Sequence, residues 1–458
     1  MQQDKTFLGT EPVGRLLFQL AVPTVTAQLV NMLYNIVDRI YIGHMPGDGS
    51  LALTGVGVCM PLIMIVSAFA ALVASGGAPR ASIAMGRGDH AGAERLLGGC
   101  AALLLLLSLT LTAVLLLWGR DLLLLFGASE NTVAYAADYM GVYAAGTVFV
   151  QLTLGLNAFV TAQGFARTGM LTVLIGALAN IALDPLFIFA LDMGVRGAAL
   201  ATIISQFVSV FLCMGRLMNP VSGECQVKWR EVRFDPEMTR MILSYGLPSG
   251  LQNSVIALAN VVVQSNINSF GEMAMSGCGA YAKVEGFAFL PITSFTSAIT
   301  TFVGQNLGAG ELRRTRQGAR FGILCSVIIA EAVGALLYWL APILIKAFTQ
   351  EPAAIAFGVQ KMRTCSLFFC LLALSHCLAA VMRGAGRAVI PMISMLSFWC
   401  VVRVAIITVA TPIYQSIAVV NWVYPITWAL SSIFLLIYYY KADWLTAPGH
   451  RSGEPVKH

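Results

Sequence analysis

The chain has 458 residues, of which 58% are apolar and only 11% are charged, and its mean hydropathy is +0.78. A soluble domain carries about 25% charged residues, so this composition excludes an ordinary soluble protein and indicates an all-α integral membrane protein. The net charge of +6 does not indicate nucleic-acid binding, because the basic residues are segregated by loop.

Apolar windows of about 20 residues predict twelve membrane spans. They begin near Leu16, Leu51, Leu96, Val133, Met170, Gly197, Met241, Ala280, Phe321, Ile355, Val389 and Ile417. The first window follows a short polar leader without a small-residue cleavage site, so we interpret it as a retained helix and not as a signal peptide.

Most of the 28 lysines and arginines lie in the two termini and in the even-numbered loops. The exceptions are Arg120, Arg196, Lys346, Lys361 and Arg363 in odd-numbered loops, and Arg39, Lys283 and Arg403 within spans. The positive-inside rule therefore predicts that both termini lie in the cytosol. We expect a multi-pass protein of the cell (inner or plasma) membrane.

The two halves of the chain share short motifs. Residues 85–89 (MGRGD) recur as residues 307–311 (LGAGE), and residues 163–167 (QGFAR) recur as residues 383–387 (RGAGR). Six spans in each half give the halves the same orientation, as in transporters built from parallel repeats. We expect an N-lobe at residues 1–218, a cytosolic connection at 219–237, a C-lobe at 238–441 and a cytosolic tail at 442–458.

The first span carries a polar stripe that ends in an acid. Gln28, Asn31, Asn35 and Asp38 follow one another in steps of three or four residues, so they share one helical face. A carboxylate at membrane depth is costly and is a functional-site candidate by default. The alternative is that such polar groups only join helices by hydrogen bonds.

The fifth span places Asn180 and Asp184 one helical turn apart in a strongly apolar segment, and Thr202 on the next span can add a hydroxyl. Desolvation favours a protonated carboxyl group, whereas carboxylate, amide and hydroxyl oxygens suit a hard cation such as Na⁺. We therefore expect Asn180, Asp184 and Thr202 to bind a proton or a cation, and we expect Asp38 to be a second ionisable candidate on the first span.

The second half has fewer acids within its spans. Asn253, Asn260 and Gln264 share a face of span 7, which carries no acid. Glu285 on span 8 can serve a second site in the C-lobe or form a local ion pair with Lys283. His376 is either a proton carrier or a satisfied interior histidine, Arg403 is placed to stack on Trp399, and Glu331 has no polar companion on its span.

Motifs for other energy sources and for catalysis are missing from the sequence. It contains no phosphate-binding loop of the Walker A type, no HExxH pair and no nucleophile elbow. The ten cysteines form no CxxC pair. We therefore expect no cofactor, no metal beyond a coupling Na⁺, and no enzymatic activity, which leaves an ion gradient as the energy source.

The chain resembles the multidrug and toxic compound extrusion (MATE) family, in its bacterial DinF-like branch, over nearly its whole length. The resemblance rests on five segments in a matching order, at residues 35–43, 85–89, 180–189, 194–199 and 303–309. It implies two pseudo-symmetric six-helix lobes, arranged as a V around a central cleft. It also implies an antiporter that exports organic, often cationic, compounds in exchange for H⁺ or Na⁺ by alternating access.

The resemblance also implies roles for particular residues. Asp38 matches the family's span-1 acid, and Asn180, Asp184 and Thr202 match positions that coordinate the cation or carry the proton. Asn157 matches a cavity asparagine. The candidates for contact with the exported compound are Gln28, Asn31, Asn35, Asn157, Asn253, Asn260, Gln264 and Glu285. The expected partners are amphipathic small molecules and lipid, and the expected oligomeric state is a monomer.

Two other functions are compatible with twelve spans. A flippase for a lipid-linked sugar would need clustered basic groups to bind pyrophosphate, and Arg39, Lys283 and Arg403 are scattered along the sequence. A membrane-embedded enzyme would need a nucleophile with a base, or a metal site, and neither pattern is visible.

The predicted orientation can be tested by labelling single cysteines introduced into a cysteine-free background. A cysteine in the connection 219–237 should react with a membrane-impermeant maleimide only from the cytosolic side, because this even-numbered loop belongs to the set that holds most of the lysines and arginines. A cysteine in place of Asp192, in an odd-numbered loop, should react only from outside. Labelling of the connection in intact cells would overturn the orientation.

Overall fold

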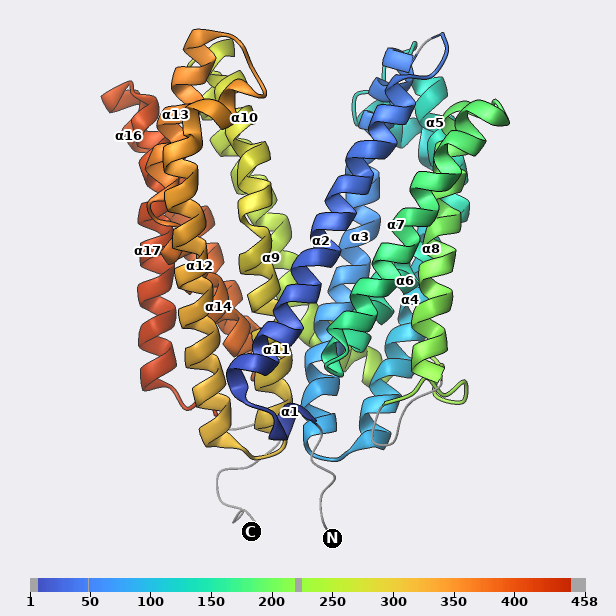
Figure 1. Ribbon diagram of the computed structural model, residues 1–458, viewed down its shortest axis with the longest axis vertical. Coiled ribbons are helices and arrows are strands. Elements are labelled where there is room, and N and C mark those ends of the chain that lie inside the picture. Colours follow the sequence, from blue (N-terminus) through green and yellow to red (C-terminus); the bar gives the residue numbers. More distant parts are fainter. Residues whose placement is uncertain (1–6, 48, 219–224, 446–458) are drawn as a thin grey trace. The chain divides into compact units, whose positions relative to one another are not determined.

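A computed structural model describes residues 7–47, 49–218 and 225–445, and every regular element among these residues is a helix (Figure 1). Parts of the predicted leader, of the connection 219–237 and of the tail 442–458 lie outside the described residues. The all-α architecture expected from the composition is therefore confirmed.

Ten stretches of described helix are long and apolar enough to cross a membrane, and two bent helix pairs raise the number to twelve. The bent pairs are α5 (Val133–Ala145) with α6 (Thr147–Ala162), at 57°, and α13 (Pro352–Ser366) with α14 (Phe369–Gly384), at 54°. The single helices are α2 (Val13–Gly43), α3 (Gly49–Gly86), α4 (His90–Leu125), α8 (Gly194–Met218), α9 (Pro236–Asn268), α12 (Leu312–Lys346) and α17 (Ile417–Lys441).

Three spans consist of consecutive helical segments. The π-helix η1 (Leu186–Ala190) continues α7 (Ala166–Pro185), and α10 (Glu272–Ala288) is followed by α11 (Leu290–Gly308). The π-helix η2 (Leu396–Val402) connects α15 (Val389–Met395) to α16 (Arg403–Tyr414). A short helix, α1 (Phe7–Thr10), precedes the first span. The predicted twelve spans are thus confirmed in number and order.

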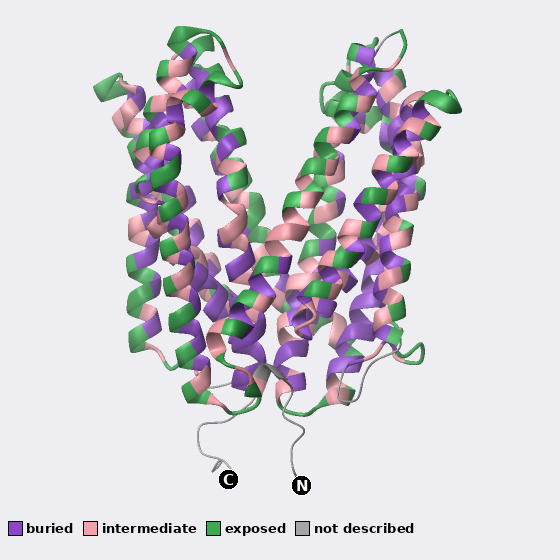
Figure 2. Cartoon of the chain, viewed as in Figure 1, coloured by how far each residue is buried: buried purple, intermediate pink, exposed green. Residues whose placement is uncertain are grey.

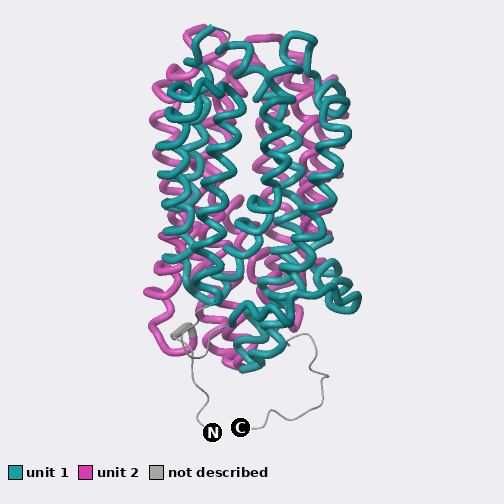
Figure 3. The backbone as a smooth tube through the Cα atoms, turned by 90° about the vertical axis from the view of Figure 1, so that its right-hand side faces the viewer, with its two compact units in different colours: residues 1–4, 26–247 teal, residues 5–25, 248–458 magenta. Residues whose placement is uncertain are grey.

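The chain forms two compact units, shown in different colours in Figure 3. The first unit comprises residues 1–4 and 26–247, and the second comprises residues 5–25 and 248–458. Helices α2 and α9 each begin in one unit and end in the other, and each contains a proline near the division, Pro23 and Pro248.

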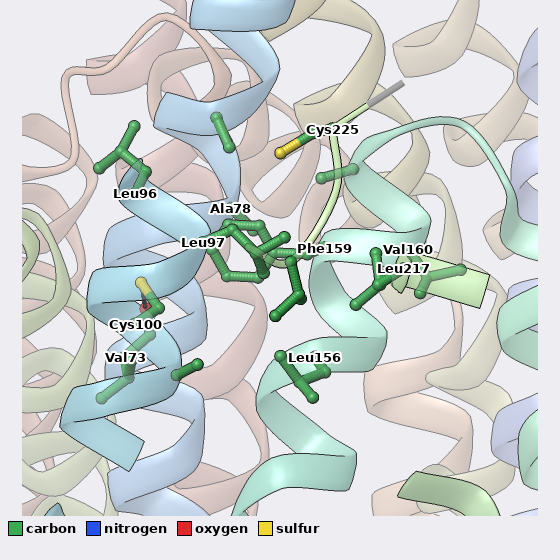
Figure 4. Packing of buried hydrophobic residues seen from close by; sticks show 14 of the residues in the cluster. Val73, Ala78, Leu96, Leu97, Cys100, Leu156, Phe159, Val160, Leu217 and Cys225 are labelled. Atoms are coloured by element: carbon green, nitrogen blue, oxygen red, sulfur yellow. Dashed lines mark hydrogen bonds between the residues drawn. The ribbon is translucent and has the colours of Figure 1, made fainter. Parts of the chain in front are cut away.

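The first unit has a continuous apolar core, part of which is shown in Figure 4. Leu97, Cys100 and Phe159 are buried between α3, α4 and α6. The chain after α8 also packs on this core, because Cys225 is buried there and donates its backbone N–H to Gln163 Oε1 at 3.2 Å. Lys228 Nζ pairs with Glu94 Oε2 at 2.6 Å, which ties this segment to the start of α4.

One of the two repeated motifs adopts the same local structure in both halves. Gly88 and Gly310 both have positive φ angles, +77° and +75°, and the acids that follow them are the N-caps of α4 and α12. Glycine adopts these angles without steric cost, which explains why this motif retains it. In the second motif the positive φ angles are not at matching positions: Gly164 (φ +94°) matches the helical Gly384, and Gly386 (φ +76°) matches Ala166.

Large apolar side chains are exposed along the helices of both units, and exposed positions alternate with buried ones in Figure 2. Leu117 is 71% exposed, Trp339 is 77% exposed and Val401 is 69% exposed. So much exposed apolar surface is unfavourable in water and suits helices that face lipid tails.

Close helix packing in the first unit can be tested with two glycines of α3. A Cβ at Gly76 would collide with the backbone oxygen of Ile242, whereas a Cβ at Gly57 would meet no atom within 4 Å. We expect Gly76→Ala to lower the free energy of unfolding by about 1–3 kcal/mol, because overpacking forces backbone shifts. Gly57→Ala should leave it unchanged or raise it slightly. Equal thermal midpoints for the two variants in detergent would contradict this packing.

Candidate functional site

Three of the four predicted coupling residues meet inside the first unit. Asp38 comes from α2, and Asn180 and Asp184 come from α7. Asp38 is 8% exposed and the other two are 0% exposed. Asn180 Nδ2 donates to Asp184 Oδ1 at 3.4 Å, and the carboxyl groups of Asp38 and Asp184 lie within hydrogen-bonding reach of each other. Helical spacing predicted that Asn180 and Asp184 share a face, and the family resemblance implied that Asp38 belongs to the same site.

The cluster has more acceptors than donors. Asp38 Oδ1, Asn180 Oδ1 and Asp184 Oδ2 are all buried and have no hydrogen-bond partner among the described residues. Two carboxylates side by side repel each other, and an unpaired buried acceptor costs about 1–3 kcal/mol. A proton shared by the acids, or a hard cation held by the three oxygens, would remove both penalties. We call Asp38, Asn180 and Asp184 the acid cluster.

Two tyrosines that sequence reasoning missed border the acid cluster. Tyr34 precedes Asp38 by one turn of α2, lies close to both acids and is within hydrogen-bonding reach of Asn35. Tyr139 of α5 is buried, lies close to Asp38 and is within hydrogen-bonding reach of Thr202. Thr202 is thus connected to the cluster through Tyr139. The sequence gives no signal for these tyrosines, because an aromatic residue in an apolar span usually only packs against its neighbours.

The rest of the polar stripe on α2 lies outside the buried cluster. Gln28 is partly buried, whereas Asn31 and Asn35 are exposed on the first unit. Asn35 Nδ2 donates to the backbone oxygen of Asn31 at 2.6 Å, a bond within the same helix. These amides share a helical face with Asp38, but they are not buried as Asp38 is.

Asn157 has a different setting. Its Nδ2 donates to Thr172 Oγ1 at 2.9 Å and to the Gly169 backbone oxygen at 3.1 Å, so it joins α6 to α7. Thr172 precedes Asp184 by twelve residues, which is about 18 Å along the helix. Asn157 therefore does not belong to the acid cluster.

The predicted amides of span 7 remain at the surface of their own unit. Asn253, Asn260 and Gln264 are all exposed on α9. Gln264 Nε2 donates to Asn268 Oδ1 at 2.8 Å, one turn further along the helix.

Glu285 of α10 does not form the local ion pair with Lys283. It accepts a hydrogen bond from the Tyr281 hydroxyl at 2.8 Å, and Lys361 and Arg403 are close enough to interact with it electrostatically. Lys283 instead places Nζ 5.2 Å from the centroid of the Phe348 ring.

The assignment of Lys361 to an odd-numbered loop is wrong. Lys361 lies within α13 and is 5% exposed. Helix α13 is the first part of the bent tenth span, and α14 is the second part. Lys361 and Arg403 contact the same aromatic ring, that of Tyr424.

Three residues without a clear role in the sequence acquire one. Glu331 Oε2 accepts the backbone N–H of Cys370 at 3.0 Å and so caps the first turn of α14, at the break of the bent pair. His376 packs edge-on against the Phe289 and Trp399 rings, which favours the interior packing role. Arg403 places Cζ 5.3 Å from the Trp399 ring centroid, which confirms the expected contact.

Helical spans, paired motifs and buried acids define an internally duplicated, multi-pass membrane protein. The family model described as MatE matches residues 23–186 and again residues 248–409. The chain therefore belongs to the MATE family of transporters, and the expected fold is that of this family.

Individual comparisons agree with this assignment. The chain is 26% identical to "Probable multidrug resistance protein YpnP" of Bacillus subtilis, over 84% of this chain and 86% of that protein. It is 24% identical to "FAD transporter" of Shewanella oneidensis, over 76% and 77% of the two chains. The solved structure titled "Outward-facing conformation of a multidrug resistance MATE family transporter of the MOP superfamily" superposes with a TM-score of 0.85, at 23% identity, and covers 96% of this chain and 97% of that one.

The separation of Asn157 from the acid cluster leads to a prediction. Asn157→Ala removes two hydrogen bonds between helices and should lower the free energy of unfolding by about 1–3 kcal/mol. It should leave the effects of pH and Na⁺ on the thermal midpoint unchanged. Asn180→Ala should reduce the effect of pH and Na⁺ on the thermal midpoint more than it lowers the free energy of unfolding without added ion. Loss of the ion effect in Asn157→Ala alone would contradict the separation.

Proposed function

We propose that the protein is a secondary active antiporter that exports organic, often cationic, drug-like compounds in exchange for H⁺ or Na⁺. Membership of the MATE family supports transport, and the printed name of the Bacillus subtilis relative supports drug-like compounds. The name of the Shewanella oneidensis relative concerns a different compound, so the identity of the cargo depends on this chain's own residues. In this proposal both termini face the cytosol.

The acid cluster is the observation on which the coupling proposal depends. Without an ion, its three buried acceptor oxygens have no partner among the described residues. A proton on one carboxyl group would let that group donate to the other acid, and Na⁺ would be coordinated by the same oxygens. Either ion stabilises the arrangement seen here, because it satisfies groups that are otherwise buried and unpaired.

Ion binding must also change the conformation for transport to be coupled. A ligand shifts an equilibrium between two states only by its difference in affinity for them. We propose that the acids meet in the ion-bound state and separate or hydrate in the ion-free state. Asp38 and Asp184 lie on different helices, so a movement of α2 against α7 changes their separation. In this way binding of the ion and release of the compound exclude each other.

Exposed amides are the proposed contacts for the exported compound. Asn31 and Asn35 on α2, and Asn253, Asn260 and Gln264 on α9, present hydrogen-bonding groups at the surface of their units. An amide can donate to or accept from many different compounds, which suits a transporter of broad specificity.

The coupling role predicts that both acids are indispensable for driven transport. Asp38→Asn and Asp184→Asn keep the side-chain size and remove the charge, so each variant should fold and reach the membrane. Each should lose at least about 90% of export driven by an imposed pH or Na⁺ gradient in proteoliposomes, because loss of an ionisable group abolishes binding of the coupling ion. Thr202→Ala should reduce export less, because it removes only one neutral ligand.

Asp138→Asn is the matched control. Asp138 lies on α5 of the same unit, but its carboxylate pairs with Arg196 at 2.7 Å where both side chains are exposed. An exposed ion pair contributes little, so this variant should transport at the wild-type rate. If Asp38→Asn and Asp184→Asn, verified as folded, also transport at the wild-type rate, the acid cluster does not couple transport to the ion gradient.

A further inference from the structure

The second unit contains a group of charged side chains that the proposed coupling mechanism does not use. Lys361 of α13 and Arg403 at the start of α16 are 5% and 2% exposed. Glu285 of α10 is the acid that interacts with both of them. We call Glu285, Lys361 and Arg403 the basic cluster. Helix α10 packs on α13, and α13 and α16 pack on α17, so all three residues belong to one bundle.

The basic cluster is held by aromatic rings. Lys361 Nζ lies 5.3 Å from the Tyr281 ring centroid and 4.9 Å from that of Tyr424. Arg403 Cζ lies 4.4 Å from the Tyr424 centroid. The ring faces attract the cations and keep both of them against Tyr424, although like charges repel each other. The arrangement thus concentrates positive charge at one point.

The charges in the cluster do not balance. With all three groups ionised, two cations face one carboxylate, which leaves one net positive charge inside the bundle. Buried charges are normally paired, because an uncompensated charge in a medium of low dielectric constant is strongly unfavourable. An aromatic ring offsets part of this cost, but it does not replace an anion.

Hydrogen-bonding capacity is also left over. Among the described residues, no acceptor lies within hydrogen-bonding distance of Lys361 Nζ, although an ammonium group has three donors. Arg403 uses Nε and one terminal nitrogen on Thr427 Oγ1, at 3.3 and 2.9 Å. Asn421, one turn before Tyr424 on α17, is 0% exposed, and neither atom of its amide has a partner in the described part of the chain.

We propose that the basic cluster is an anion-binding site of the second unit, which takes a monovalent anionic group between Lys361 and Arg403. Such a group balances the excess charge and accepts the unused hydrogen bonds of Lys361, Arg403 and Asn421. Chloride and the carboxylate of an organic compound share this chemistry. Glu285 competes with the anion for the same cations. The site is independent of the acid cluster, so either proposal can fail without the other.

The test is the thermal midpoint of the purified full-length protein, measured as chloride replaces gluconate in sodium salts at constant ionic strength. A ligand that binds only the folded state raises the midpoint in a saturable manner. We expect such a rise for the wild type and at least a fivefold smaller one for Lys361→Met. Glu285→Gln should lower the half-saturating chloride concentration about tenfold, because it removes the competing carboxylate.

Lys283→Met is the matched control, since Lys283 lies on α10 beside Glu285 but is exposed and contacts Phe348. It should keep the full chloride response. If Lys361→Met does not fold, Arg403→Lys serves instead: it keeps the charge, loses the planar group and should weaken the response. A midpoint that does not respond to chloride in the wild type, or equal responses in Lys361→Met and Lys283→Met, would overturn the proposal.

A competition experiment distinguishes the two sources of the anionic group. Benzoate that raises the half-saturating chloride concentration, in the wild type and not in Lys361→Met, assigns the site to the carboxylate of an organic compound as well. A chloride response that benzoate does not alter assigns the site to a small inorganic anion. Whichever source supplies the group, bromide soaked into a crystal should give an anomalous scattering peak beside Lys361 and Arg403. Bromide peaks found only at other positions would show that the anion does not bind at the basic cluster.

Discussion

The cost of a polar group without a partner at membrane depth governs both candidate sites of this protein. Bulk water is excluded there, so each carboxylate, ammonium group or amide must be satisfied by another side chain or by a ligand. Most polar groups of the helices meet this requirement, as Glu331 does by capping α14 and Asn157 does by bonding α7. Several single polar atoms, such as Gln151 Oε1 and His376 Nε2, also lack a partner among the described residues. The acid cluster and the basic cluster differ because each gathers ionisable groups together with unpaired polar atoms, and this is the physical reason to assign ligands to them.

The two units use the same helical plan for opposite charges. The first unit buries an excess of acceptors around Asp38 and Asp184, and the second buries an excess of positive charge around Lys361 and Arg403. The helix order, the bent pairs and the glycine turns repeat, because they depend on backbone geometry and packing. Charged side chains are not needed for that geometry, so substitution after duplication could change them without loss of the fold.

Much of the architecture was predictable from the sequence, because length and hydropathy determine the spans and glycine marks the turns. The pairing of Asn180 with Asp184 was also predictable, since they lie one helical turn apart. That Asp38 of another helix meets them was implied only by the family resemblance, because periodicity within one helix says nothing about its neighbours. The charge count placed Lys361 in a loop, although the apolar window that begins near Ile355 already indicated a helix there, and α13 contains it. The bend between α13 and α14 and the tyrosines around the acid cluster were not predictable, because each depends on tertiary packing.

The two π-helical segments lie beside residues of the two clusters. A π-turn bonds residue i to residue i+5, is rare, and occurs frequently at functional sites. Segment η1 follows Asp184 almost directly, at the end of its span, whereas η2 ends immediately before Arg403, in the first half of the equivalent span. A π-turn shifts the direction in which the side chains after it point by part of a helical turn. The two units therefore orient the residues next to their clusters with the same local device placed at different points of the span.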